Sequence, residues 1–194
     1  MARAILFDLD GTVWDSRPWY ARLLHARGAG SMAAQQALLE AGEPAAVLIR
    51  RAGLSASGFR GVCSLEPPPL YDGVAEMMGR LVAAGVRLGA ATNLPKWLYA
   101  PMLAAHGDSL RFETVIGWSD ARRKPKPDPL ELAMERLGVK TGQEHWYVGD
   151  TASDAEAAVA AGMSFGWAAW GYDLQPPGGT SRRLDRPQEV VALV

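Results

Sequence analysis

Short apolar runs alternate with segments of helical periodicity along this chain. Strands buried on both faces are apolar throughout, whereas helices repeat their apolar residues every three or four positions. The pattern predicts five strands, at residues 3–8, 86–93, 112–118, 145–150 and 163–170. It predicts helices that start near residues 74, 96, 128 and 153, and a short last helix at 187–193. Strands that alternate with helices are typical of a parallel sheet with helices on both faces.

Local signals mark some of the predicted boundaries. Asp128 stands where an N-cap is expected, Pro129 would be the first helical residue, and Glu131 would lie in the first turn. Gly138 is predicted to end this helix, because glycine tolerates the left-handed conformation that follows many helices. The sequence PPGG at 176–179 predicts a turn.

The stretch from residue 16 to residue 70 interrupts this alternation. Helical patterns surround Leu23 and continue at 32–42 and 44–53, and a proline-rich connector follows at 65–73. We therefore predict an α/β fold, a Rossmann-like three-layer parallel sheet with a small helical cap inserted after the first strand. The predicted core domain comprises residues 1–15 and 71–194, and the predicted cap comprises residues 16–70.

Composition narrows the class of protein. The chain has 194 residues, of which 48% are hydrophobic, which suits one domain with a small insert. Its 20 basic and 21 acidic residues give a net charge of −1, so we expect neither a nucleic-acid partner nor a polybasic membrane anchor. Cys63 has no second cysteine to pair with, and no apolar stretch is long enough to span a bilayer. We expect a soluble cytoplasmic protein, and the sequence sets no oligomeric state.

Polar side chains stand at the predicted carboxyl ends of four strands. Asp8 and Asp10 follow the first strand, and alternation along a strand places residues two apart on the same side. Two carboxylates held that close resist ionising together, which a bound cation or a catalytic role would explain. The other strand ends carry Thr92 with Asn93, Lys124, and Asp150 followed by Asp154. Since ligands of open parallel sheets bind beyond these ends, we expect the side chains to converge.

These residue types suit a phosphoryl group and a hard cation. Mg²⁺ prefers oxygen ligands, which Asp8, Asp10 and Asp150 offer. Lys124 adds positive charge and Thr92 a hydrogen-bond donor for phosphoryl oxygens. One carboxylate can attack phosphorus and form an aspartyl-phosphate, while a second transfers protons. The sequence therefore predicts a Mg²⁺-dependent phosphoryl site.

The motifs DLDGT at 8–12, TN at 92–93, KPKP at 124–127 and GDTASD at 149–154 together resemble the haloacid dehalogenase superfamily. The stretches TNLPKWLYAPMLAAHG, VIGWSDARRKPKPDPLELAMERLG and AAGMSFGWAAWGYD are similar to its phosphoglycolate phosphatase branch. The resemblance covers nearly the whole chain outside the predicted cap. It implies a Mg²⁺-dependent phosphatase that acts on a small phosphorylated metabolite. The insert is shorter than the cap usual in that branch, and the cap carries much of the substrate selection.

The resemblance also implies roles for single residues. The implied catalytic set is Asp8 as nucleophile, Asp10 as general acid and base, Thr92 as hydrogen-bond donor and Lys124 as stabilising cation. We also predict that Asn93 and Gly11 contact the substrate. The implied metal ligands are Asp8, the backbone carbonyl of Asp10, Asp150 and, either directly or from behind these ligands, Asp154.

Several of these residues have a plainer alternative. Lys126 also precedes a proline, although the family's lysine begins the KPxP run, which favours Lys124. Ser153 and Glu156 have capping-box spacing, so Asp154 could instead only stabilise a helix N-terminus. Gly11 could serve only a backbone turn. The pair Arg50-Arg51 either meets an anionic substrate or faces solvent.

The same residues bear on which other functions of the superfamily are compatible with this sequence. Haloacid dehalogenases do not need the second acid, so Asp10 argues against that reaction. Phosphonoacetaldehyde hydrolases need a cap lysine, and residues 12–95 contain none. A phosphomutase of this superfamily and a non-catalytic binding protein stay as alternatives, the latter disfavoured by the presence of all three strand-end aspartates.

Overall fold

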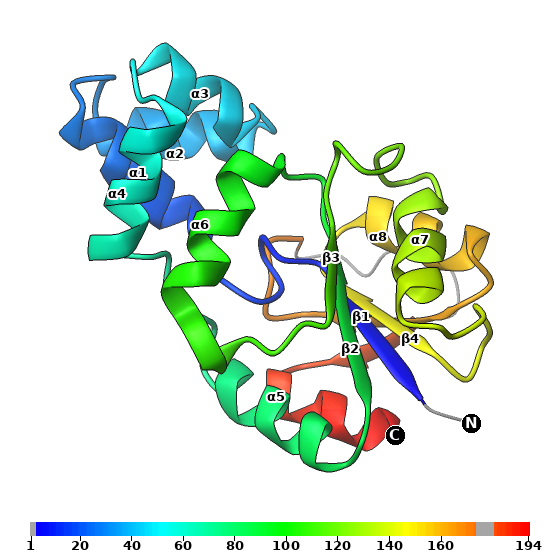
Figure 1. Ribbon diagram of the computed structural model, residues 1–194. Coiled ribbons are helices and arrows are strands. Elements are labelled where there is room, and N and C mark those ends of the chain that lie inside the picture. Colours follow the sequence, from blue (N-terminus) through cyan, green and yellow to red (C-terminus); the bar gives the residue numbers. More distant parts are fainter. Residues whose placement is uncertain (1–2, 174–180) are drawn as a thin grey trace. The chain divides into compact units, whose positions relative to one another are not determined.

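Two units make up the computed structural model, which describes residues 3–173 and 181–194 (Figure 1). The first, here called the core unit, comprises Met1–Trp14, Leu70–Asn93 and Asp108–Val194. The second, the helical unit, comprises Asp15–Pro69 and Leu94–Gly107. The turn predicted at 176–179 lies outside the described residues.

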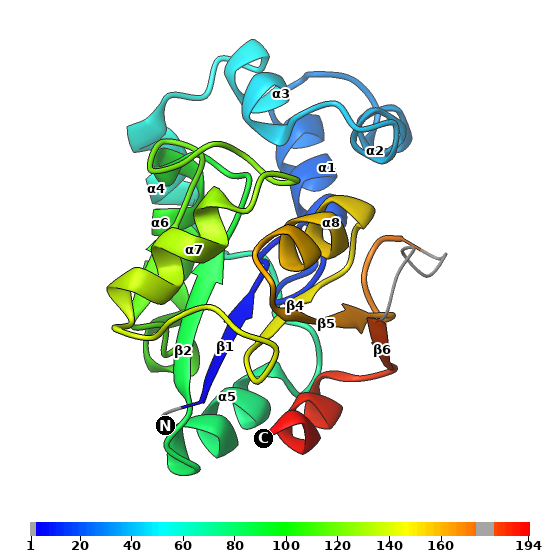
Figure 2. The ribbon, with the colours of Figure 1, turned by 90° about the vertical axis from the view of Figure 1, so that its right-hand side faces the viewer.

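A parallel sheet of six strands, in the order β3-β2-β1-β4-β5-β6, forms the centre of the described part of the core unit (Figures 1 and 2). The strands are β1 (Ala4–Phe7), β2 (Arg87–Ala91), β3 (Thr114–Ile116), β4 (Trp146–Gly149), β5 (Ser164–Ala168) and β6 (Ser181–Leu184). Central β1 pairs Leu6 with Gly89 of β2 and with Tyr147 of β4. In this strand order the crevice that binds ligands opens beyond the carboxyl ends of β1 and β4.

Helices cover both faces of this sheet. They are α5 (Val74–Ala83), α7 (Asp128–Arg136), α8 (Ala152–Ala160) and the short 3-10 helix η2 (Pro187–Leu193). A further 3-10 helix, η1 (Gly107–Ser109), precedes β3 in the chain. Helices α7 and α8 lie on one face, and α5 packs with η2 on the other (Figure 2). Under α7 and α8, a buried cluster joins Leu6, Met134, Tyr147 and Phe165. The predicted three-layer α/β fold is confirmed.

The structure corrects several predicted boundaries. Strand β6 was not predicted, because its sequence SRRL is no apolar run and its arginines are exposed at the sheet edge. The segment 187–193 is a 3-10 helix. Asp128 is not the N-cap of α7: Pro127 precedes the helix, and no side chain caps it. Asp128 lies in the first turn, where its carboxylate accepts a hydrogen bond from Arg122 at 2.6 Å.

The helical unit contains α1 (Ser16–Ala26), α2 (Met32–Glu40), α3 (Ala45–Arg51), α4 (Ala56–Leu65) and α6 (Lys96–His106). Its interior is aromatic: the rings of Trp19 and Phe59 lie 5.8 Å apart, and Phe59 lies 5.8 Å from Trp97 of α6. His106 also contacts the Pro68 carbonyl oxygen at 2.9 Å. These contacts explain why α6, which follows β2 in the chain, belongs to this unit although the sequence division placed it in the core.

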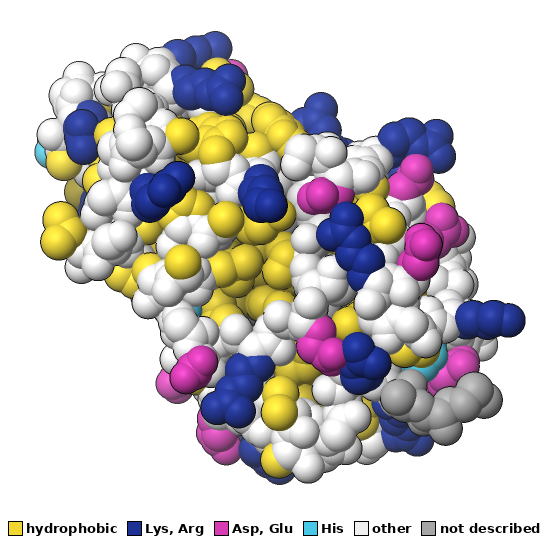
Figure 3. All heavy atoms as spheres, in the orientation of Figure 1, with side chains coloured by type: hydrophobic (Ala, Val, Ile, Leu, Met, Phe, Trp, Pro, Cys, Tyr) yellow, Lys and Arg dark blue, Asp and Glu magenta, His cyan; other side chains and the backbone are white. Residues whose placement is uncertain are grey.

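Within residues 3–173 and 181–194, no helix combines the length and apolar character needed to cross a bilayer. On the face shown in Figure 3, the described Lys and Arg side chains are scattered among neutral and acidic ones.

Candidate active site

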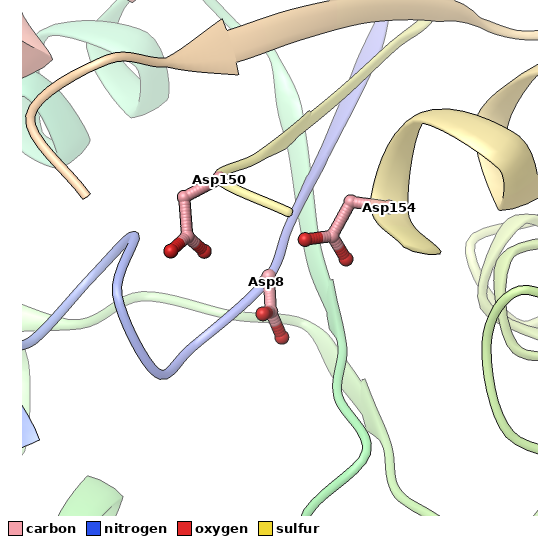
Figure 4. A group of neighbouring side chains, drawn as sticks. All are labelled: Asp8, Asp150 and Asp154. Carbon is pink, nitrogen blue, oxygen red and sulfur yellow. The ribbon is translucent and has the colours of Figure 1, made fainter. Parts of the chain in front are cut away.

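Three aspartates meet at the carboxyl end of the sheet (Figure 4). Asp8 follows β1, Asp150 follows β4, and Asp154 lies in the first turn of α8. Each is buried, and one carboxylate oxygen from each lies within 4.8 Å of the others. The structure therefore brings together three acids that the sequence placed at strand ends.

A tight turn after β1 brings the chain against Asp150. Gly11 has a φ of +83°, a conformation that side-chain-bearing residues rarely adopt. A Cβ at Gly11 would also overlap Asp150 Oδ2 and the ring of Tyr172. The turn that was considered as the plainer explanation of Gly11 is thus present, and its predicted contact with substrate stays a prediction.

Asp150 accepts hydrogen bonds from two distant parts of the chain. Thr12 Oγ1 donates to Asp150 Oδ1 at 3.1 Å, and the backbone N–H of Tyr172 donates to Oδ2 at 2.9 Å. Gly171 packs so closely that a Cβ there would overlap Asp150 and the carbonyl oxygen of Gly11. These contacts hold the carboxylate of Asp150 in one orientation.

Asp154 has two functions in the structure. Its Oδ2 accepts hydrogen bonds from Thr151 N and Thr151 Oγ1, at 2.9 and 2.6 Å, which makes Thr151 and Asp154 the capping box of α8. The box suggested for Ser153 and Glu156 is therefore replaced by one two residues earlier. Its Oδ1 lies 2.6 Å from Lys124 Nζ, so Asp154 also anchors the buried lysine.

Lys124 reaches the site from the loop after β3. Its ammonium lies 2.9 Å from Asp8 Oδ1 and is buried with it. The Lys124 N–H donates to Asn93 Oδ1 at 2.9 Å, and Asn93 Nδ2 donates to the Lys124 carbonyl oxygen at 3.2 Å. Asn93 thus holds the lysine loop, and its predicted substrate contact stays a prediction. Lys126 is exposed, so of the two candidate lysines only Lys124 enters this site.

Asp10 and Thr92 flank the three aspartates. Asp10 is half-buried, and its Oδ1 accepts a hydrogen bond of 2.6 Å from the indole N–H of Trp14. Thr92 is buried at the end of β2, where its N–H donates to the Ile116 carbonyl oxygen at 2.9 Å. Asp10 follows β1, as Asp8 does, and Thr92 follows the neighbouring strand β2, so both stand at the carboxyl end of the sheet, as predicted.

Sequence reasoning missed Tyr147. Its hydroxyl accepts a hydrogen bond from Lys124 Nζ at 2.7 Å and lies 2.9 Å from the Ala91 carbonyl oxygen and 3.0 Å from Asp154 Oδ1. The residue belongs to the apolar run of β4 and is fully buried, so it resembled a core aromatic. Its place three residues before Asp150, on the strand beside β1, was the available signal.

Charges in this site strongly influence one another. Burial raises the pKa of Asp8 to about 7, partly opposed by Lys124 and reinforced by Asp154. Burial, with Asp154 and Asp8, raises the pKa of Asp150 well above its usual value. Burial alone would raise the pKa of Asp154, but Lys124 and Thr151 hold it below the ordinary value. Burial would lower the pKa of Lys124, but Asp154 and Asp8 raise it.

The site fits a divalent cation. Among the described residues, three buried carboxylates share one ammonium group, that of Lys124. The pKa values of Asp8 and Asp150 are raised, which indicates that the site has too little positive charge to hold all three carboxylates ionised. The Lys124 ammonium reaches only Asp8 Oδ1 and Asp154 Oδ1 of these carboxylates, at 2.9 and 2.6 Å among the described contacts. A hard cation with oxygen ligands would supply the missing positive charge.

The Tyr147→Phe variant should be less stable and slower. Removing the hydroxyl takes one hydrogen bond from Lys124 and leaves a buried ammonium less well held, at a cost of about 2 kcal/mol in the free energy of unfolding. Denaturant unfolding measures that loss, and steady-state kinetics should show a lower kcat with a nearly unchanged KM. An unfolding free energy and a kcat equal to those of the wild type would contradict this function of Tyr147.

Comparisons with known proteins agree with the geometry. Residues 2–162 match the family model of the haloacid dehalogenase-like hydrolases. A phosphoglycolate phosphatase of Xanthomonas campestris pv. campestris is 36% identical over 190 residues, covering 89% of this chain and 85% of that protein. One of Escherichia coli strain K12 is 32% identical over 209 residues, covering 88% and 82%. The solved structure of a HAD-superfamily hydrolase from Geobacter sulfurreducens shares the fold, with a TM-score of 0.72, 22% identity and 100% coverage of both chains.

Proposed function

The chain belongs to the haloacid dehalogenase-like hydrolases, and from that membership we propose that it is a Mg²⁺-dependent phosphatase of small phosphomonoesters. One observation carries the proposal: Asp8 is buried at the end of β1, where its Oδ1 lies 2.9 Å from the Lys124 ammonium and where Asp150 and Asp154 add two more buried carboxylates. A carboxylate fixed in such a site can attack an electrophile such as phosphorus.

Asp8 is the proposed nucleophile. One of its oxygens attacks phosphorus, an aspartyl-phosphate forms, and the bond from phosphorus to the leaving oxygen breaks. Asp10 stands two residues on at the same sheet edge and is the proposed general acid that protonates the leaving oxygen. Asp10 then accepts a proton from the water that hydrolyses the aspartyl-phosphate, which regenerates both carboxyl groups for the next turnover.

Lys124 is the proposed stabilising cation. Its ammonium lies 2.9 Å from Asp8, where phosphoryl oxygens would arrive, and positive charge fixed there favours the negatively charged transition state. Asp154 and Tyr147 hold it, at 2.6 and 2.7 Å, so that little reorganisation is needed during the reaction. Thr92, buried at the same edge, is the proposed additional donor to the phosphoryl group.

The proposed metal ligands are Asp8, Asp150 and the backbone carbonyl of Asp10. Asp154 is the weaker ligand candidate, because its two oxygens already accept hydrogen bonds from Lys124, Tyr147 and Thr151. When bound, Mg²⁺ would neutralise charge on the phosphoryl group and on the neighbouring carboxylates. Asp150 is held for this purpose by Thr12 and Tyr172.

The curated relatives are named phosphoglycolate phosphatases, so phosphoglycolate is the first substrate to test. Phosphate release should be measured from phosphoglycolate, sugar phosphates, nucleotides and a phosphopeptide, with Mg²⁺ and with a chelator. The expected result is Mg²⁺-dependent release from a small ester by the wild type and none by Asp8→Asn. Release that persists equally in the variant or in chelator would contradict the proposal.

Mg²⁺ binding should weaken as the pH falls. In the metal-free protein Asp8 has a pKa of about 7, so below about 7 a proton occupies a carboxylate that the cation needs. We expect the dissociation constant for Mg²⁺ to rise by roughly tenfold for each pH unit below that value. Calorimetric titration at pH values on both sides of 7 measures it, and a constant affinity would argue against Asp8 as a ligand.

Stability gives an independent measure of the same linkage. Because the folded-state pKa of Asp8 lies above its unfolded value of 3.8, the metal-free protein should lose stability as the pH rises from about 4 through about 7. Mg²⁺ should offset that loss, so its effect on the unfolding temperature should grow with pH. Asp150→Asn should show a much smaller Mg²⁺ effect at every pH.

A further inference from the structure

Trp14 makes a hydrogen bond that no part of the proposed mechanism uses. Its indole N–H donates to Asp10 Oδ1 at 2.6 Å. The turn at Gly11 brings Trp14 back beside Asp10, and Trp14 N donates to the Leu9 carbonyl oxygen at 3.2 Å. The indole therefore meets the acid from within its own loop.

The indole is held firmly. Trp14 is 0% exposed, and its backbone bridges to Asp10 on one side and to Leu70 on the other. The Trp14 carbonyl oxygen accepts a hydrogen bond of 3.0 Å from Gly11 N. A buried side chain with a fixed backbone has little freedom to turn, so it can set the orientation of the carboxyl group that it binds.

An indole nitrogen is a donor only. In a protonated carboxyl group the oxygen without the proton is the better acceptor, so a donor on Oδ1 favours the proton on Oδ2. We propose that Trp14 is a positioning residue for the reaction: its indole fixes Asp10 so that Oδ2 carries the proton to the leaving group. This inference rests on the proposed phosphatase function and assigns a reacting atom within it.

How strongly the reaction depends on the proton from Asp10 differs between alkyl and aryl phosphate esters. As an Asp8 oxygen bonds to phosphorus, the bond to the leaving oxygen breaks, its electron pair stays on that oxygen, and the oxygen takes the Oδ2 proton. An alkoxide is a poor leaving group and needs this proton, whereas p-nitrophenolate is a stable anion and leaves without it. A loss of orientation at Asp10 should therefore slow alkyl esters selectively.

The test compares kcat/KM for an alkyl ester and for p-nitrophenyl phosphate in Trp14→Phe. The alkyl ester is phosphoglycolate or, if the wild type prefers it, the best alkyl phosphate of the panel. General acid catalysis contributes roughly 10²–10⁴-fold, so we expect the alkyl ester to lose on the order of 10–100-fold more than the aryl ester. An equal loss for both esters, or no loss, would overturn the proposal.

Trp170→Phe is the matched control. The Trp170 indole donates to the Thr12 carbonyl oxygen of the same loop at 3.0 Å, so this variant removes an indole hydrogen bond that does not reach Asp10. It should affect both esters alike. If Trp14→Phe fails to fold, Trp14→Leu removes the indole N–H without placing another donor beside Asp10, and the same ratio of the two esters decides.

A double-mutant cycle separates positioning from general damage. If Trp14 acts through Asp10, Trp14→Phe should cause no further selective loss for the alkyl ester in the Asp10→Asn background. Additive selective losses would overturn the proposal. A wild type that hydrolyses neither ester would instead refute the proposed phosphatase function, so the two failures are distinguishable.

Discussion

Asp8→Asn is expected to lower phosphate release by on the order of 10⁴-fold or more, because it removes the proposed nucleophile. The amide has nearly the same shape as the carboxylate, but it is a much poorer nucleophile and does not form the aspartyl-phosphate. The reaction should be followed as phosphate release at saturating ester and Mg²⁺. Turnover above about a hundredth of the wild-type rate would contradict the assignment.

The same variant should remain folded. The environment of Asp8 raises its pKa to about 7, which means that the fold disfavours the ionised carboxylate. Above about 7, in chelator, the neutral amide should therefore leave the unfolding temperature unchanged or raise it. Asp120→Asn is a suitable control, since Asp120 accepts a hydrogen bond from Gly117 N in a loop outside the proposed machinery.

Lys124→Met should have the second large effect. The methionine side chain keeps the length but leaves the buried Asp8 and Asp154 without their cation. Removing one partner of a buried ion pair costs about 3–5 kcal/mol in the free energy of unfolding. Turnover should fall by roughly 10²–10³-fold, because a fixed charge no longer stabilises the transition state. Denaturant unfolding in chelator and steady-state kinetics measure the two effects.

The matched control is Lys126→Met, two residues away, also before a proline, and exposed. It should be close to wild type in stability and turnover, and a loss as large as that of Lys124→Met would reverse the choice between the two lysines. The pH dependence has a definite sign. Because Lys124 holds the pKa of Asp154 below its usual value, its stabilisation should be present near neutral pH and shrink at acid pH, as Asp154 is protonated.

The prediction that polar residues at the carboxyl ends of the strands lie close together agrees with the structure. Asp8 and Asp150 were placed at one edge because parallel strands direct their carboxyl ends to the same side of a sheet, and the structure brings them together with Asp154 and Lys124. The predicted catalytic, substrate-binding and metal-binding roles stay predictions until the variants are measured. So does the assignment of the helical segment as a substrate-selecting cap.

Residues that act through hydrogen bonds formed only in the folded protein left weak signals in the sequence. Tyr147 sits in an apolar strand, and only the pairing of β4 with β1 and the entry of the lysine loop direct its hydroxyl to Lys124. Tyr172 meets Asp150 from 22 residues away. Trp14 is four residues from Asp10, and although a turn at Gly11 was one interpretation of the sequence, that spacing does not reveal that the turn directs the indole to Asp10.

The sequence by itself determined the class of fold, the family and the edge of the sheet where the chemistry gathers. Those conclusions depend on periodicity and on short motifs, which are local properties of the chain. The tertiary structure alone decided that α6 joins the helical unit and that β6 is an edge strand of the sheet. It also decided that Tyr147 contacts Lys124 and that Trp14 contacts Asp10. Each of these depends on packing and hydrogen bonds that form only when the strands and loops are assembled, and residue patterns along the chain do not encode such geometry visibly.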